Sequence, residues 1–150
     1  MSSLVYIYLR NNDLYGHLNF LKTGKLTNLF SLWLDNNDIG QSIPTQVAQL
    51  VNLASLSISN TTLTGTIPTE LGLLPDLNRI WLYGNKLTGT IPTELGELTL
   101  LEVLDLHNNS LKGHMPSHVC QAIKASNYSK KELVADCHKV NCSCCTKCYY

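Results

Sequence analysis

Leucine and isoleucine recur along the chain with a period of 24 or 25 residues. Five successive runs have the pattern LxxLxLxxNxL, and their sixth positions are Leu9, Leu34, Ile58, Leu82 and Leu106. The string LTGTIPTELG occurs at residues 63–72 and again, unchanged, at residues 87–96. A fixed period of this length is typical of a solenoid, in which similar coils stack and each coil contacts its neighbours.

Within each run the alternation of side chains predicts one short strand. Positions 4 and 6 point into the core, and positions 3, 5 and 7 point to solvent. Because one coil cannot bury its apolar face alone, the coils share a continuous core. A buried asparagine at position 9 can bond the backbone of adjacent coils. This predicted ladder consists of Asn12, Asn37, Asn85 and Asn109, and we expect Thr61 to weaken it in the third run.

The extended pattern LxxLxLxxNxLTGxIPxxLGxLxxL resembles the plant-type leucine-rich repeats of receptor ectodomains and of polygalacturonase-inhibiting proteins. The resemblance implies an α/β fold. In this fold a right-handed solenoid has a parallel β-sheet on its concave face, a second short sheet beside it, and 3-10 or irregular structure on its convex side. We expect five repeats at residues 1–116 and a cysteine-rich cap at residues 117–150. Met1 stands inside a repeat, and the paired-cysteine N-terminal cap of the family is missing, so we expect a longer parent protein, N-terminally truncated here.

Charge and hydropathy exclude some classes of function. The 11 basic and 11 acidic side chains give a net charge of zero, so nothing indicates a nucleic-acid partner or an anionic membrane surface. No apolar run approaches the ~20 residues that span a bilayer, and no signal peptide is visible. A transmembrane or kinase domain of a membrane-anchored parent protein would lie outside this sequence.

All six cysteines follow the last repeat, which predicts a disulfide-bonded C-terminal cap and no cofactor. The residues are Cys120, Cys137, Cys142, Cys144, Cys145 and Cys148. The segment ADCHKVNCSCCTKCYY also resembles the caps of secreted algal leucine-rich repeat proteins. A zinc knuckle that uses Cys142, Cys144, Cys145 and Cys148 with His138 or His118, and a redox motif at Cys145 and Cys148, are the alternatives. Six cysteines allow fifteen connectivities, and the sequence does not choose among them.

The cap sequence supports two further expectations. Residues 132–137 (ELVADC) predict a last strand that covers the open edge of the sheet, with a helical capping box at Ser129 and Glu132 as the alternative. Disulfides predict a secreted or extracellular location. Sequons predicted to carry glycans, at Asn60, Asn108 and Asn127, agree with that location, and a fourth sequon lies at Asn141.

Outward-facing positions 3, 5 and 7 form three columns on the predicted concave face. Tryptophan, tyrosine and arginine are frequent at binding hot spots, and aromatic faces also suit sugar rings. Isolated exposed aromatic residues are, however, common on any surface. We expect Ser55, Ser57 and Ser59 to floor a shallow pocket between two solvent-facing tryptophans. The predicted ligand-binding residues are Tyr6, Tyr8, Arg10, Trp33, Asp35, Arg79, Trp81, Tyr83, Asp105 and His107.

These features predict a non-catalytic extracellular recognition module, of the kind found in receptor-like proteins. Its expected partner is a protein, a peptide or a cell-wall glycan. One alternative is an inhibitor of a secreted cell-wall hydrolase, which the resemblance implies. Another is an ice-binding, antifreeze-like solenoid, because Thr64, Thr66 and Thr69 recur 24 residues later as Thr88, Thr90 and Thr93. Asp105 and His107 share a face but have no suitably placed nucleophile, so we do not expect an enzyme.

Overall fold

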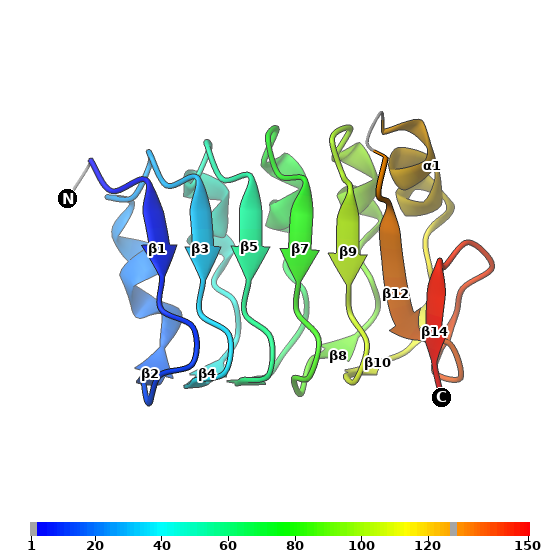
Figure 1. Cartoon of the computed structure of the whole chain (residues 1–150), viewed down its shortest axis with the longest axis horizontal. Helices are drawn as coiled ribbons and strands as arrows, with labels where there is room; N and C mark the ends of the chain where they lie inside the picture. Colours follow the sequence, from blue (N-terminus) through cyan, green and yellow to red (C-terminus); the bar gives the residue numbers. More distant parts are fainter. Residues whose placement is uncertain (1–2, 127–128) are drawn as a thin grey trace.

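The repeats stack side by side and build one parallel sheet along one side of the molecule. The computed structural model describes residues 3–126 and 129–150. In the order β1-β3-β5-β7-β9-β12-β14, seven strands pair in parallel. Figure 1 shows these strands in one row. They are β1 (Tyr6–Tyr8), β3 (Ser31–Trp33), β5 (Ser55–Ser57), β7 (Arg79–Trp81), β9 (Val103–Asp105), β12 (Glu132–Asp136) and β14 (Lys147–Tyr149).

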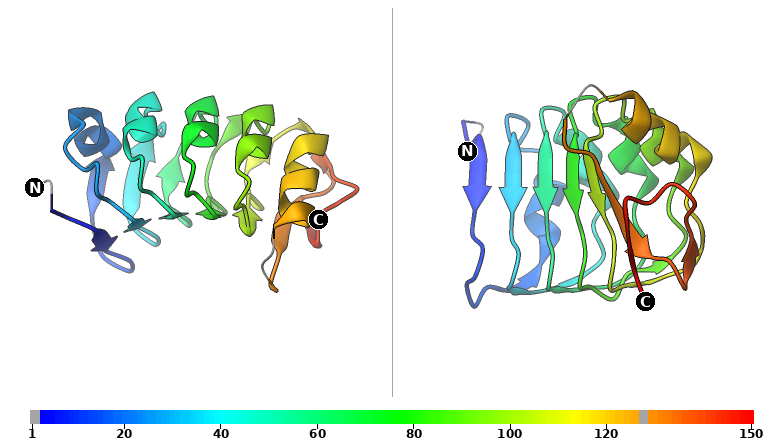
Figure 2. Two further views of the ribbon diagram at one scale, coloured as in Figure 1. Left: turned by 90° about the horizontal axis from the view of Figure 1, so that it is seen from above. Right: turned by 45° about the vertical axis from the view of Figure 1, so that its right-hand side comes forward.

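Short helices cover the opposite side of the core, as Figure 2 shows. The 3-10 helices are η1 (Leu18–Thr23), η2 (Thr45–Gln49), η3 (Thr69–Leu73) and η4 (Thr93–Glu97), and α1 (Ser117–Ala125) follows them. Between the two sides lie further short strands, which pair in small parallel sheets. These strands are β2 (Tyr15–His17), β4 (Asp38–Gln41), β6 (Thr62–Leu63), β8 (Thr88–Gly89), β10 (Ser110–Leu111), β11 (Gly113–His114) and β13 (Val140–Asn141). The predicted solenoid, with its second sheet and its 3-10 helices, is therefore confirmed.

One apolar core runs the length of the solenoid. The residues at positions 4 and 6 of the interior strands, such as Leu56, Ile80 and Leu104, are fully buried. Two glycines allow the helical side to pack closely. A Cβ atom on Gly72 would lie 2.3 Å from the carbonyl oxygen of Glu94, and one on Gly96 would lie 2.4 Å from the Cβ of His118. The glycine that ends each copy of the duplicated string is thus required where one helix contacts the next.

The asparagines at position 9 bond adjacent coils, as the sequence predicts. The Asn85 Nδ2 donates to the carbonyl oxygens of Ile58 and Leu82 at 2.7 and 3.0 Å, and its Oδ1 accepts from the Leu63 N–H at 3.1 Å. Asn37 and Asn109 repeat this geometry. The Thr61 hydroxyl donates to the Asn85 Oδ1 at 2.6 Å, so Thr61 joins the ladder through its neighbour.

A second asparagine column, which the sequence analysis does not identify, lies at position 8. Each residue there has a left-handed backbone conformation, with φ between 51° and 67°. Asparagine and glycine tolerate this conformation better than other residues, which explains the sequence preference. The column consists of Asn11, Asn36, Asn60, Gly84 and Asn108. It turns the chain away from the strand and toward the flank.

The cysteine-rich segment closes the C-terminal end of the solenoid. The strand β12 pairs with β9, as expected for ELVADC, and β14 pairs with β12. α1 packs against η4 and buries Val119 in the core. The disulfides are Cys120–Cys144, Cys137–Cys148 and Cys142–Cys145. All six cysteines are therefore paired, which leaves no thiolate for the alternative zinc knuckle and pairs Cys145 with Cys142 instead of Cys148.

A carboxylate fixes β12 to the preceding coil. Asp136 accepts hydrogen bonds from the backbone N–H groups of Asn108 and Asn109 at 2.8 and 3.0 Å, and its carboxylate lies 3.5 Å from the Lys139 Nζ. Burial raises the pKa of Asp136, but these two N–H donors and the charge of Lys139 outweigh burial and hold the pKa below its ordinary value. The ionised carboxylate thus stabilises the cap.

Among the described residues, no helix is both long and apolar enough to cross a membrane.

Candidate functional site

The outward-facing side of the seven-stranded sheet, called the strand face below, carries every residue predicted to bind ligand. The alternation of side chains led us to expect that all of these side chains face solvent. Some of them are buried instead. Tyr6 and Tyr8 are 54% and 53% exposed, whereas Asp35 and Asp105 are only 4% and 8% exposed. Trp33 and Trp81 are half-buried. The larger side chains lie flat across the sheet and cover the smaller ones.

Aromatic side chains gather at the N-terminal end of the strand face. The rings of Tyr8 and Trp33 lie 4.5 Å apart, and Tyr6 contacts both Tyr8 and Phe30, with ring centroids 5.8 and 6.0 Å apart. The Arg10 guanidinium lies 4.3 Å from the Trp33 ring centroid. Four aromatic rings and one cation therefore form a connected cluster. Phe30, at position 2 of its run, was not among the predicted residues.

Beside this cluster the strand face is hollowed by a cavity of about 380 Å³. The small residues Ser31, Ala54 and Ser55 form its buried floor, between the aromatic cluster and the side chains of Asn78 and Arg79. The Trp33 indole N–H donates to the Ser55 hydroxyl at 2.8 Å, which fixes the indole ring. The sequence pattern predicted the pocket between two tryptophans. Instead, Arg79 takes the place expected for Trp81.

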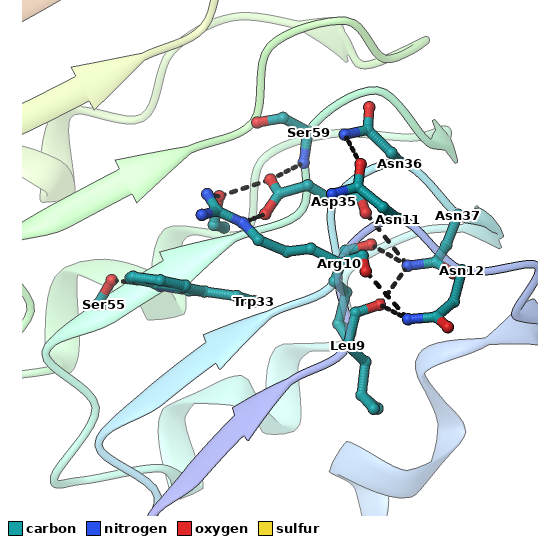
Figure 3. A network of polar contacts seen from close by, with 12 residues as sticks. Leu9, Arg10, Asn11, Asn12, Trp33, Asp35, Asn36, Asn37, Ser55 and Ser59 are labelled. Atoms are coloured by element: carbon teal, nitrogen blue, oxygen red, sulfur yellow. Dashed lines mark hydrogen bonds and ion pairs between the residues drawn. The ribbon is translucent and has the colours of Figure 1, made fainter.

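A polar network supports Arg10 from below (Figure 3). The buried carboxylate of Asp35 forms an ion pair with Arg10 and accepts hydrogen bonds from the Ser57 hydroxyl and, at 2.9 Å, from the Ser59 N–H. The network lies beneath the aromatic surface, so Asp35 orients Arg10 and is not itself accessible to a ligand. Ser57 and Ser59, expected to line a pocket, belong to this buried layer.

Stacked rings occupy the C-terminal end of the strand face. The His107 ring lies between Tyr83 and Tyr149, with centroids 4.8 and 3.9 Å away and interplanar angles of 8° and 11°. The His107 Nδ1 lies 2.6 Å from the Asp105 carboxylate. Burial raises the pKa of the Tyr83 phenol, and the nearby carboxylates of Asp35 and Asp105 raise it further. The phenol therefore remains protonated and able to donate a hydrogen bond at neutral pH.

The C-terminal cap contributes residues to this surface that the repeat pattern does not reveal. Strand β14 carries Tyr149 into the stack, and the Lys147 Nζ lies 4.9 Å from the Tyr149 ring centroid. The hydrogen bond to the Tyr149 phenol raises the pKa of Lys147. In the sequence, the alternation of Lys147, Cys148 and Tyr149 was the one available signal, and it is too short to identify a strand.

The sequons within the described residues lie outside the strands of the main sheet. Asn60 and Asn108 are exposed on the left-handed turns at position 8. Asn141 is exposed in β13, next to the disulfide-bonded Cys142. Asn127 lies outside the described residues.

The fold and the repeats together define the class of protein. The family described as Leucine Rich Repeat matches residues 52–74, 76–98 and 100–122. Each matched segment contains one strand of the main sheet and all or, in the third segment, the first part of the helix that follows it. Together with the stacked coils, these matches define a leucine-rich repeat solenoid.

Similar solved structures include extracellular parts of plant receptors. The chain resembles the crystal structure of a TDR receptor (33% identity, TM-score 0.78, 89% of this chain). It also resembles the Arabidopsis receptor kinase HAESA, solved with the peptide hormone IDA and the co-receptor SERK1 (32% identity, TM-score 0.77, 89% of this chain). A third similar structure is a plant ice-binding protein (27% identity, TM-score 0.73, 87% of this chain).

The chain covers only part of each of these structures. It spans 22% of the TDR receptor structure, 22% of the HAESA structure and 40% of the ice-binding protein. No curated protein matches the chain. The comparisons thus support a leucine-rich repeat solenoid that resembles receptor ectodomains.

Proposed function

We propose that this chain is a non-catalytic recognition module of an extracellular protein and that it binds a peptide segment of its partner on the strand face. The observation that carries the proposal is the exposed aromatic cluster beside a hollow of about 380 Å³. Rigid aromatic side chains supply large contact areas at low entropic cost and are enriched at binding hot spots. The similarity to HAESA, whose structure contains a peptide hormone, supports the proposal.

Two further observations support the extracellular and non-catalytic parts of the proposal. Three disulfides are typical of proteins in an oxidising compartment. His107 is held between two aromatic rings and bonded to Asp105, which suits a structural role in the surface better than proton transfer to a substrate. The proposal extends to the longer parent protein, with its signalling partners and any membrane anchor.

The experiment is a selection from a random dodecapeptide library displayed on phage, with the disulfide-bonded chain immobilised. We expect enriched peptides to bind the wild type and to lose affinity at least tenfold for the double variant Tyr6→Ala, Tyr8→Ala. The matched control is Tyr15→Ala, which removes an 87% exposed tyrosine from the flank strand β2. Peptides that bind both variants equally well, or a library that yields no binder, would exclude the strand face as a peptide site.

Two related functions would use the same surface. A neutral cell-wall oligosaccharide added during the selection would compete with the peptides if the strand face binds glycan. Inhibition of a secreted cell-wall hydrolase would appear as a loss of polysaccharide cleavage that Tyr6→Ala, Tyr8→Ala reverses. Neither result is expected if the partner is a peptide.

Ice binding is a second candidate because one similar structure is a plant ice-binding protein. The exposed residues Thr64, Thr66, Thr88 and Thr90 form two rows on the flank, and the Thr66 and Thr90 methyl groups pack near Gly89 and Gly113 of the next coil. The rows end at Lys112 and His114 in the following coil. Thermal hysteresis that disappears in the double variant Thr66→Tyr, Thr90→Tyr would establish this function.

A further inference from the structure

We infer that the hollow on the strand face is the anchor pocket for a tyrosine side chain of the peptide partner. This inference rests on the proposed function and names the residue that the site selects. It follows from the chemistry of the two walls of the hollow, one of which is aromatic and the other polar.

The aromatic wall fits a planar ring. Tyr6, Tyr8, Phe30 and Trp33 line one side, and their rings are mutually tilted by 36°, 66° and 40° along the cluster. Tilted and edge-to-face arrangements are the favoured geometries between aromatic rings. A further ring can therefore join the cluster with the same geometry. Small floor residues leave room for it, because Ser31, Ala54 and Ser55 carry no large side chain.

The polar wall offers N–H donors and a carbonyl acceptor, and the charge of its arginine is balanced. The Arg79 Nε and Nη2 atoms both donate to one carboxylate oxygen of Glu102, at 3.0 and 2.9 Å. The remaining N–H groups of this guanidinium are available, while Glu102 balances its charge. The Asn78 Nδ2 donates to the Asp76 carbonyl at 3.2 Å, and this bond leaves the Asn78 Oδ1 as an acceptor.

A phenolic hydroxyl satisfies both groups of the polar wall. It accepts one hydrogen bond, from Arg79, and donates another, to Asn78. A carboxylate would offer acceptors only and would meet an arginine whose charge is already balanced. At about 380 Å³ the hollow lies at the small end of ligand pockets, which suits one large side chain.

The test is a double-mutant cycle between a selected peptide and the chain. We expect tyrosine to be enriched at one position of the selected peptides, and its replacement by phenylalanine to weaken binding to the wild type about ten- to hundredfold, the usual effect of losing two hydrogen bonds. In Asn78→Leu or Arg79→Met only one of the two bonds remains, so the same replacement should weaken binding only about three- to tenfold. Isothermal titration calorimetry measures all four combinations, and circular dichroism verifies that each variant is folded.

The matched control is Asn52→Leu, which changes an exposed asparagine outside the hollow whose Nδ2 also donates to a backbone carbonyl. This variant should retain the full effect of the tyrosine-to-phenylalanine replacement. Peptides that require Tyr6 and Tyr8 but show no preference for tyrosine would overturn this inference and leave the proposed function intact. If no peptide depends on the strand face, the proposed function and the inference both fail.

Discussion

Replacing Asn85 by alanine should destabilise the chain far more than the same change at Asn12. Asn85 is 9% exposed, and its side chain makes four hydrogen bonds within and between two adjacent coils. Alanine removes all four and leaves the buried Ile58 carbonyl and Leu63 N–H unpaired, whereas the Leu82 carbonyl keeps its hydrogen bond from Asn109. At about 1 kcal/mol for each lost bond, with a larger penalty for unpaired buried groups, the expected loss is about 4 kcal/mol.

Asn12 is the matched control because it occupies the same repeat position in the first coil. Its Nδ2 donates to the carbonyls of Leu9 and Arg10 at an exposed site, so we expect Asn12→Ala to cost about 1 kcal/mol or less. Urea unfolding followed by circular dichroism, with the disulfides intact, measures both values. In a thermal melt the difference of about 3 kcal/mol corresponds to roughly 6–12 °C. Equal losses in the two variants would refute the reasoning that the ladder stabilises the solenoid through its buried bonds.

Three further predictions test the packing. Trp33→Ala should reduce the free energy of unfolding by about 2 kcal/mol, because the indole contacts the Tyr8 ring and the Arg10 guanidinium and donates a hydrogen bond. A change below about 0.5 kcal/mol in urea unfolding would contradict this. Because the folded pKa of Asp136 is lowered, its stabilising effect is present above the unfolded pKa of about 3.9 and disappears as the pH falls through the folded pKa. The stability gap between wild type and Asp136→Asn in urea titrations should therefore be constant above about pH 5 and close below about pH 4, whereas a constant gap down to about pH 2 would argue against this charge effect. Gly72→Ala should cost more than about 2 kcal/mol, because the new Cβ meets a backbone carbonyl at 2.3 Å, while Gly40→Ala, where the nearest atom is the Thr62 hydroxyl at 3.3 Å, should cost less than about 1 kcal/mol.

The repeat pattern predicted the backbone well because local sequence decides it. Leucine and isoleucine at positions 4 and 6 are buried wherever coils stack on both sides, and asparagine at position 9 bonds backbone groups that every coil presents in the same place. The last strand at β12 was also predictable, since its apolar alternation matches that of β9. These features recur in the structure with the same period as the sequence repeat.

The surface of the strand face was less predictable. Alternation correctly assigned each side chain to the outer face, but it carries no information on how neighbouring side chains cover one another. Asp35 is buried beside Arg10 of the preceding coil, and Asp105 is buried beside His107 of its own coil. Phe30 entered the cluster from position 2, which the columns of positions 3, 5 and 7 do not include.

The sequence by itself determined the solenoid, its core, its asparagine ladder and the presence of a disulfide-bonded cap, because each depends on a period or a composition that is local to the chain. The tertiary structure decided which cysteines pair, where the hollow lies and how the cap brings Tyr149 onto His107. Apart from the short Cys137–Cys148 and Cys142–Cys145 loops, these features depend on distances between residues that are far apart in sequence. Such distances are set when the coils stack and β14 joins the sheet.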